Sequence, residues 1–191
     1  MSELAPVVFL DSFLVRLRPL EPSDAPLLFR WINDPEVRIF VTAFLPQTMS
    51  QEEEFIKKAN DNNNVVLGIE EKETGEFIGV MGLHDISWVN RTATTGAIIG
   101  VKEKRGIGLG TDAKMALLRY AFKDLGLRKI NSSVISFNER SRRYSEKCGY
   151  RFEGVKKKQF FKNGEYADEI LLAVFAEDWD QVWEQYQLSK K

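Results

Sequence analysis

A stretch of alternating glycines, KRGIGLGTD at residues 104–112, constrains the fold of this chain more than any other segment. It follows an apolar, strand-like run and precedes a run with apolar residues at helical spacing. Glycine has no Cβ, so its backbone can approach a ligand closely, and the first N–H groups of a helix have no intrahelical partner. Together with the positive end of the helix dipole, these properties suit a phosphate group. We therefore interpret the stretch as a phosphate-binding loop rather than a plain turn.

The spacing of the glycines excludes two common phosphate-binding loops. A P-loop requires G-x-x-x-x-G-K-[ST], and no Lys-Ser or Lys-Thr pair follows these glycines. A dinucleotide fingerprint requires G-x-G-x-x-G, but Thr111 stands at the last position, and the next strand ends without the acidic residue that would hold a ribose. A third pattern, [RQ]-x-x-G-x-[GA], fits Arg105 to Gly110 at every position.

Around this loop, the hydrophobic periodicity predicts an α+β fold with a mixed sheet and flanking helices. Strands are expected at 13–20, twice within 64–88, and at 92–101, 129–137, 150–161 and 165–176, and helices at 21–34, from 36, and at 48–61, 111–126, 138–149 and 177–188. Ser50 with Glu53 suggests a capping box, Asn138 an N-cap, and Gly149 a left-handed helix end. The pair Asn163-Gly164 predicts a hairpin turn. No repeat or linker divides the chain, so one domain is expected over residues 1–191.

Composition excludes several function classes. The formal net charge is −1, which gives no overall basic bias toward nucleic acid or an anionic membrane. Cys148 and His84 are the only cysteine and histidine, so neither an internal disulfide nor a Cys/His zinc site is expected. The N-terminal residues lack a signal-peptide pattern, and no run reaches the roughly 20 apolar residues of a membrane helix. We expect a soluble, cytoplasmic protein that holds no metal.

Four further segments extend the pattern along the chain. They are LRPLEPSDAPLLFRWINDPEV at 17–37, VNRTATTGAIIGV at 89–101, FNERSRRYSEKCGYRFEGV at 137–155 and FKNGEYADEILLAVFAEDW at 161–179. With the glycine loop, they resemble the GNAT N-acetyltransferases, in particular the RimJ/RimL-type branch, over about residues 13–179. The resemblance implies a mostly antiparallel, seven-stranded GNAT sheet whose fourth and fifth strands, 92–101 and 129–137, are parallel and splay apart. Residues 1–12 would form an N-terminal extension and 176–191 a C-terminal helix.

The resemblance also implies acetyl-CoA as the co-substrate, bound where the two strands splay. Pantetheine would bond to the backbone of Ile99 and Val101. The diphosphate would rest on the N–H groups of Arg105, Gly106, Ile107, Gly108, Leu109, Gly110 and Thr111. The helix predicted at 138–149 completes the expected cofactor contacts with Asn138, Ser141 and Arg143. Arg143 belongs to a basic stripe on this helix that suits the 3′-phosphate of CoA.

In this family the acceptor amine attacks the thioester carbonyl directly, so the amine must lose a proton and the leaving CoA thiolate must gain one. Many relatives carry Glu on the fourth strand, but this position is Thr95, which cannot act as a base. Many also carry Tyr four residues before the helix-ending glycine, but this position is Ser145, and the tyrosine is Tyr144. We rank Ser145 and then Tyr144 as the catalytic proton donor, with Ser141 through water, or solvent, as alternatives. The general base stays open.

The acceptor is the least constrained part of the prediction. Analogy to the RimJ/RimL branch favours a protein N-terminal α-amine. The alternatives are a small amine, such as a polyamine, amino sugar or aminoglycoside, and a non-catalytic acetyl-CoA-binding module. A polyamine site would need several carboxylates at the cleft, and the sequence shows no clear cluster. Phe40 and Phe44 are the best candidates for acceptor-facing aromatics, and His84 is expected to be structural. We expect a monomer or a homodimer.

Overall fold

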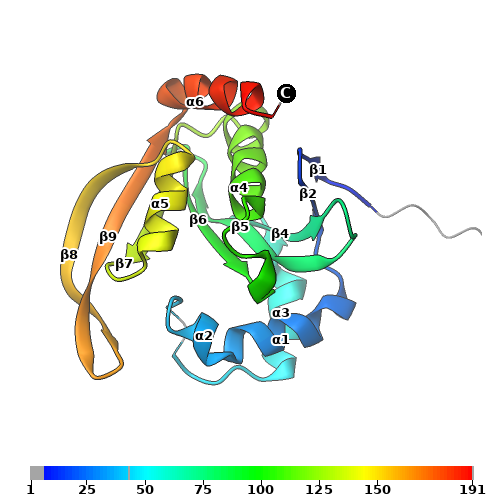
Figure 1. Ribbon diagram of the computed structural model, residues 1–191, viewed down its shortest axis with the longest axis vertical. Coiled ribbons are helices and arrows are strands. Elements are labelled where there is room, and N and C mark those ends of the chain that lie inside the picture. The colour runs from blue at the N-terminus through cyan, green and yellow to red at the C-terminus, as the bar shows by residue number, and fades with distance from the viewer. Residues whose placement is uncertain (1–6, 43, 191) are drawn as a thin grey trace, which may run out of the picture.

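The computed structural model describes residues 7–42 and 44–190 (Figure 1). Its strands are β1 (Leu10–Asp11), β2 (Val15–Pro19), β3 (Asn60–Asp61), β4 (Asn64–Glu71), β5 (Phe77–Ser87), β6 (Thr92–Ile99), β7 (Lys129–Ile135), β8 (Arg151–Lys162) and β9 (Glu165–Phe175). Its helices are α1 (Ala25–Asn33), α2 (Pro35–Arg38), α3 (Met49–Lys58), α4 (Leu109–Arg119), α5 (Glu139–Lys147) and α6 (Ala176–Leu188). A π-helical turn, Tyr120–Asp124, extends α4. Within the two described ranges, no helix has both the length and the hydropathy needed to span a bilayer.

One mixed sheet organises the fold, with its strands in the order β1-β2-β4-β5-β6-β7-β9-β8 and β3 paired to β4. The neighbouring strands are antiparallel except β6 and β7, which are parallel. These two strands pair only between Thr92–Thr94 and Lys129–Asn131, and beyond this point their backbones are no longer paired. The expected α+β arrangement with a splayed parallel pair is thus confirmed. The described sheet has nine strands rather than seven, because β1 and β3, each two residues long, add to it.

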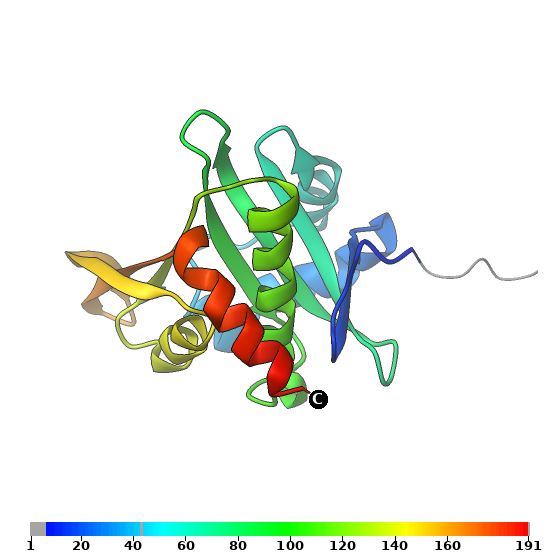
Figure 2. The same cartoon turned by 90° about the horizontal axis from the view of Figure 1, so that it is seen from above.

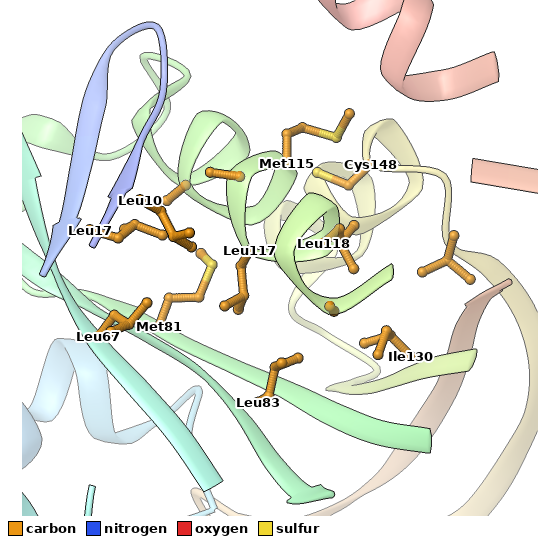
Figure 3. Close-up of a cluster of buried hydrophobic side chains, with 14 of the residues drawn as sticks. Leu10, Leu17, Leu67, Met81, Leu83, Met115, Leu117, Leu118, Ile130 and Cys148 are labelled. Atoms are coloured by element: carbon orange, nitrogen blue, oxygen red, sulfur yellow. The ribbon is translucent and has the colours of Figure 1, made fainter. Parts of the chain in front are cut away.

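Helices cover both faces of the sheet. Figure 2 shows α4 and α6 in front of the strands, with α1, α2 and α3 behind them. A large apolar core lies between α4 and the sheet, where Leu117 points toward Met81 and Leu83 of β5 (Figure 3). A smaller core around Trp31 of α1 fills the opposite face and includes Val80 of β5. Because successive strand residues point to opposite faces, β5 contributes side chains to both cores. The splayed strand β6 pairs with β5 along its length.

The helix that follows the glycine loop begins earlier than predicted. We predict its start at residue 111, whereas α4 begins at Leu109, directly after Gly108 in a left-handed conformation with φ of 99°. The Leu109 side chain is 4% exposed and packs in the large core. This packing favours a helix that begins at Leu109. Residues 109–111 therefore form the first helical turn, and their N–H groups belong to the helix N-terminus.

The capping box of α3 also lies at a different position. Thr48 and Gln51 form it, not Ser50 and Glu53, because Thr48 is the last extended residue and Ser50 already lies inside the helix. The short helix α2 begins at Pro35, one residue before the expected start. These differences of one or two residues leave the order of elements unchanged.

The turn and cap signals around the second half of the sheet are confirmed. Asn163 and Gly164 have φ of 53° and 85°, as the tight turn of a β-hairpin requires, and they join β8 to β9. Asn138 caps α5 by accepting a hydrogen bond from the Ser141 amide (3.1 Å). Gly149 ends that helix with φ of 94°. Each signal depends on a few adjacent residues, so the local sequence is sufficient to predict it.

Candidate active site

A cavity of about 950 Å³ lies where β6 and β7 stop pairing. Its wall includes the glycine loop and the start of α4, residues of β5, β6 and β7, and one face of α5. The segments around α1, α2 and α3 close it on the other side of the sheet. Cofactor and ligand sites commonly have volumes of roughly 300–1,000 Å³. The segments expected to hold the cofactor and those expected to face the acceptor therefore share one cavity.

The glycine loop presents free backbone N–H groups at this cavity. Gly106 and Gly108 have positive φ values that L side chains rarely adopt, and they line the cavity together with Gly110 and Thr111. Within the described part of the chain, no protein group accepts a hydrogen bond from any N–H between Gly106 and Thr111, and the first bond of the helix runs from the Asp112 amide to the Gly108 carbonyl. A run of free amides at the positive end of a helix dipole suits a diphosphate.

The Arg105 side chain fixes the loop to the end of β6. Its guanidinium donates to the carbonyls of Ile99 (2.9 Å) and Gly100 (2.8 Å). The amides of Gly100 and Val101 both donate to the Ile78 carbonyl, on the β5 side of the strand. Since successive residues of a strand direct their backbone groups to opposite sides, the Ile99 backbone faces the gap that β7 leaves. Of the two residues expected to contact pantetheine, Ile99 lines the cavity and Val101 does not.

Other expected cofactor contacts separate into two groups. Asn138, Ser141 and Arg143 line the cavity from α5, where Arg143 is largely exposed and reaches solvent at the cavity rim. Ile107 is exposed and Leu109 is buried in the core, and neither side chain lines the cavity. These two residues can therefore contribute only backbone N–H groups.

The two expected proton donors lie in different environments. Tyr144 lines the cavity, whereas Ser145 is fully buried behind its wall. The Ser145 Oγ accepts a hydrogen bond from Nζ of Lys114 (3.1 Å). Lys114, which the sequence reasoning did not single out, lines the cavity from the second turn of α4 and is 2% exposed. Of these two hydrogen-bonded residues, Lys114 therefore lines the cavity and Ser145 does not.

The position of the missing carboxylate on β6 is occupied by a structural hydroxyl. Thr95 is buried, and it shares a hydrogen bond with the Tyr150 hydroxyl (2.8 Å) and donates to the Asn131 carbonyl (3.3 Å). These bonds join β6 to β7 and to the residue before β8, directly beyond the last paired residue of β6. Thr95 thus marks the inner end of the splay.

Lys114 is a buried cation without a carboxylate partner among the described residues. Its Nζ lies 4.1 Å from the ring centroid of Tyr144 and 4.7 Å from that of Tyr150. Burial lowers the pKa of Lys114 from 10.5 to about 8, because the ammonium loses hydration that two aromatic rings and one hydroxyl only partly replace. Burial also raises the pKa of Tyr144 well above 10 and that of the Cys148 thiol to about 12. The lysine is therefore the most acidic of these neighbours, and Cys148 is a packing residue.

Replacing Lys114 with methionine is expected to stabilise the protein at pH 7. Between about pH 8 and 10.5 the unfolded chain binds a proton that the folded chain does not, so wild-type stability rises with pH through this window. The gap of about 2.5 pKa units (10.5 minus 8) corresponds to roughly 3 kcal/mol as an upper bound. We expect urea unfolding to show a gain on the order of 1–3 kcal/mol at pH 7 that shrinks by pH 10.5.

Lys123→Met is the matched control, because Lys123 is half exposed and paired with Asp180 (2.5 Å). Its effect is expected to stay within about 0.5 kcal/mol at either pH. A Lys114→Met gain that does not change with pH would contradict a lowered pKa of Lys114 in the folded protein.

The far end of the cavity is apolar and aromatic. Val37, Phe40 and Phe55 line it from the region of α2 and α3. The Phe40 ring packs 6.0 Å from that of Phe137, which precedes α5. Phe44, the second aromatic expected to face the acceptor, is 75% exposed and does not line the cavity.

Carboxylates at the cavity are few and paired. Glu36 accepts from Lys102 (2.8 Å) and Glu139 from Arg143 (3.0 Å), and no other described Asp or Glu lines the cavity. The cationic lining residues are Lys104, Arg105, Lys114, Arg140, Arg143 and Lys147. The excess of positive charge suits the phosphates of an anionic ligand. Residues 7–42 and 44–190 contain no group of three or more His, Cys, Asp or Glu side chains that could hold a metal ion.

The single histidine of the sequence lies at the wall of the cavity. His84 lines it from β5, and the ring lies over Gly82 and Gly96, where a Cβ would come within 3.2 Å of Nε2. Burial lowers the pKa of His84, although Asp85 opposes this shift. The imidazole is therefore neutral at pH 7 and able to accept a proton.

Comparison with known proteins agrees with this geometry. Residues 15–151 match the family model described as an acetyltransferase (GNAT) domain. A putative ribosomal N-acetyltransferase of Bacillus subtilis, YdaF, is 28% identical over 174 residues, which are 87% of this chain and 93% of that protein. The spermidine N(1)-acetyltransferase of Escherichia coli K12 is 30% identical over 162 residues, 84% of this chain and 86% of that protein. The spermidine N-acetyltransferase of Vibrio cholerae, solved with CoA and spermine, has a TM-score of 0.80 at 26% identity and covers 87% of this chain and 98% of its own.

Proposed function

We propose that the acceptor of this protein is the N-terminal α-amine of a polypeptide. The chain belongs to the acetyltransferase (GNAT) family and is an acetyl-CoA-dependent N-acetyltransferase. The RimJ/RimL-type assignment is part of this proposal. The choice of an α-amine acceptor rests on the acceptor end of the cavity, which is apolar and aromatic. The carboxylate of Glu36 in this region is already paired with Lys102. The uncharged residues that follow an N-terminal amine can be buried there at little cost in free energy. A polyamine would instead lose the hydration of its further ammonium groups.

In this proposal the cofactor follows the glycine loop into the splay. The diphosphate rests on the free amides of residues 106–111, and pantetheine bonds to the Ile99 backbone. Arg143 meets the 3′-phosphate at the rim. The thioester then lies near Thr95, where β6 and β7 part.

The proton chemistry also favours an α-amine. An N-terminal amine has a pKa of about 7.7–8.0, against about 10.4 for a lysine-like alkyl amine, so far more of it is neutral at pH 7. The cavity offers no unpaired carboxylate as a base among its described residues, and the imidazole of His84, which lines the cavity, is neutral at pH 7. We propose that His84, or water beside it, accepts the proton that the amine loses on attack.

A polyamine is the second candidate, because two spermidine acetyltransferases are similar to this chain and one buried carboxylate is unpaired. Glu52 of α3 is 8% exposed, its side-chain carboxylate takes part in no hydrogen bond or ion pair in the described structure, and burial raises its pKa. It lines a pocket of about 320 Å³ that shares Phe55, Ile32 and Val80 with the main cavity. A second ammonium of a long amine would meet Glu52 in this pocket.

Steady-state kinetics with acetyl-CoA separate the two candidates. We expect kcat/KM for short peptides with a small, free N-terminal residue to exceed that for spermidine by about 10-fold or more, since one missing carboxylate partner costs an extra ammonium roughly 1.5–3 kcal/mol. The same peptides with a blocked α-amine are the control and should be inert. A kcat/KM for spermidine above that of every peptide, together with a fall of about 10-fold in Glu52→Gln, would show that the acceptor is a polyamine and not an α-amine.

A further inference from the structure

We propose that the Lys114 ammonium donates a proton to the CoA sulfur as the thioester breaks. This role rests on acetyl transfer from acetyl-CoA and not on the acceptor class proposed above. The thiolate needs an acid. Ser145 lies behind the cavity wall with its Oγ bound to Lys114, and Tyr144, which lines the cavity with its ring face toward Nζ, is a weak acid because burial raises its pKa well above 10. Lys114 contacts both residues and also lines the cavity.

Lys114 meets the cavity at the inner end of the splay. Its Nζ lies 4.7 Å from the Tyr150 ring, and the Tyr150 hydroxyl bonds to Thr95, the first residue of β6 beyond the segment paired with β7. The lysine stands four residues after Gly110, so it is one helical turn deeper than the phosphate loop. An extended ligand that starts at the loop and enters the splay therefore brings its far end toward this ammonium.

The groups that face Lys114 are weaker acids. Tyr144 of α5 and Cys148, the residue after that helix, face it together with Tyr150 from the segment before β8, and burial raises the pKa of all three. The pKa of Lys114, lowered to about 8, lies close to the value of about 8.5 for an ordinary thiol. Proton transfer between groups of matched pKa requires little driving force in either direction, which is the favourable case for general acid catalysis.

The step balances without a further reactant. The amine lone pair forms the new N–C bond at the thioester carbonyl, the C–S bond breaks with its electron pair on sulfur, and the Nζ proton passes to sulfur. The attacking amine releases one proton to His84 or solvent, and neutral Lys114 takes one from solvent before the next turnover. Ser145, whose Oγ accepts from Nζ, is a positioning residue in this scheme.

Lys114→Met tests the proposal in the intact protein. We expect the single-turnover rate of acetyl transfer to fall by about 100-fold, with KM for acetyl-CoA within about twofold of wild type. In the wild type the rate should fall as pH rises through about 8, because the proton to be donated is lost there, and this fall should be absent from the variant. Lys123→Met is the control, and its rate and pH profile should match wild type.

An unchanged rate and pH profile in Lys114→Met would overturn the proposal. A raised KM for acetyl-CoA with an unchanged turnover number would also overturn it, because Lys114 would then be a ligand of the CoA phosphates. The assays use whichever amine the protein acetylates fastest, so failure of the peptide proposal does not affect them. Since the variant is expected to be more stable than wild type, a slower rate with normal urea unfolding is not a folding defect.

Discussion

Gly108→Val is expected to raise the dissociation constant for acetyl-CoA by about 100-fold or more. Gly108 precedes the first turn of α4 with φ of 99° and lines the cavity. Valine adds a branched side chain in a conformation that L residues avoid, and it keeps the diphosphate away from the free amides. Hydrogen bonds to a charged group contribute about 1.5–3 kcal/mol each, so losing two of them accounts for this factor. Isothermal titration calorimetry measures the change.

Two matched variants separate close approach from backbone strain. Gly75, in the turn between β4 and β5, has φ of 72° and open space around its Cβ position, so Gly75→Ala should destabilise the fold by about 1 kcal/mol and leave acetyl-CoA affinity unchanged. Gly110 lies in the first helical turn, where a Cβ would make an ordinary contact with Ile99 (3.7 Å). Gly110→Ala should fold normally and bind acetyl-CoA about 10-fold more weakly. Unchanged affinity in both loop variants would exclude the loop as the phosphate site.

Asp112→Ala is expected to have the largest effect on stability, a loss on the order of 4–6 kcal/mol. Asp112 is fully buried in α4 and accepts hydrogen bonds from Ser12 Oγ (2.8 Å), the amides of Leu14 (2.6 Å) and Val15 (3.0 Å), and the Tyr186 hydroxyl (2.5 Å). It thus ties the start of β2 and the C-terminal helix to α4. Alanine would leave these donors without an acceptor, at about 1–3 kcal/mol for each buried group.

Tyr186→Phe removes one of these bonds and keeps the carboxylate, so it should cost only about 1 kcal/mol. Urea unfolding of the two variants beside wild type measures the difference. Because Asp112 holds the same helix that carries the loop, Asp112→Ala should also weaken acetyl-CoA binding. An Asp112→Ala loss no larger than that of Tyr186→Phe would show that the carboxylate is not the anchor.

Local sequence signals predict most of the fold and the position of the glycine loop at the helix N-terminus. The alternating glycines, the Asn138 cap and the Asn163-Gly164 turn each depend on a few neighbouring residues, and the structure has a corresponding feature at each place. The predicted start of α4 is two residues too late, because the true start depends on Leu109 packing against distant strands. The placement of Val101 outside the cavity depends in the same way on the bond of its amide to Ile78.

Lys114 shows why the site is harder to predict than the fold. It stands three and four residues before Leu117 and Leu118, so its helical spacing already places it on an apolar face. Lysine is rarely buried without a partner, and its long side chain usually reaches water, so this spacing alone does not indicate burial. The burial follows from Tyr144 and Tyr150, which a separate part of the chain packs against α4.

A crystal structure of the protein with CoA bound tests the central claim most directly. We expect the diphosphate oxygens within hydrogen-bond distance of the amides of residues 106–111, with pantetheine beside Ile99 in the splay between β6 and β7. The sulfur should lie within reach of the Lys114 Nζ, near Thr95. A diphosphate bound away from the glycine loop, or a sulfur on the far side of the sheet from Lys114, would contradict this assignment.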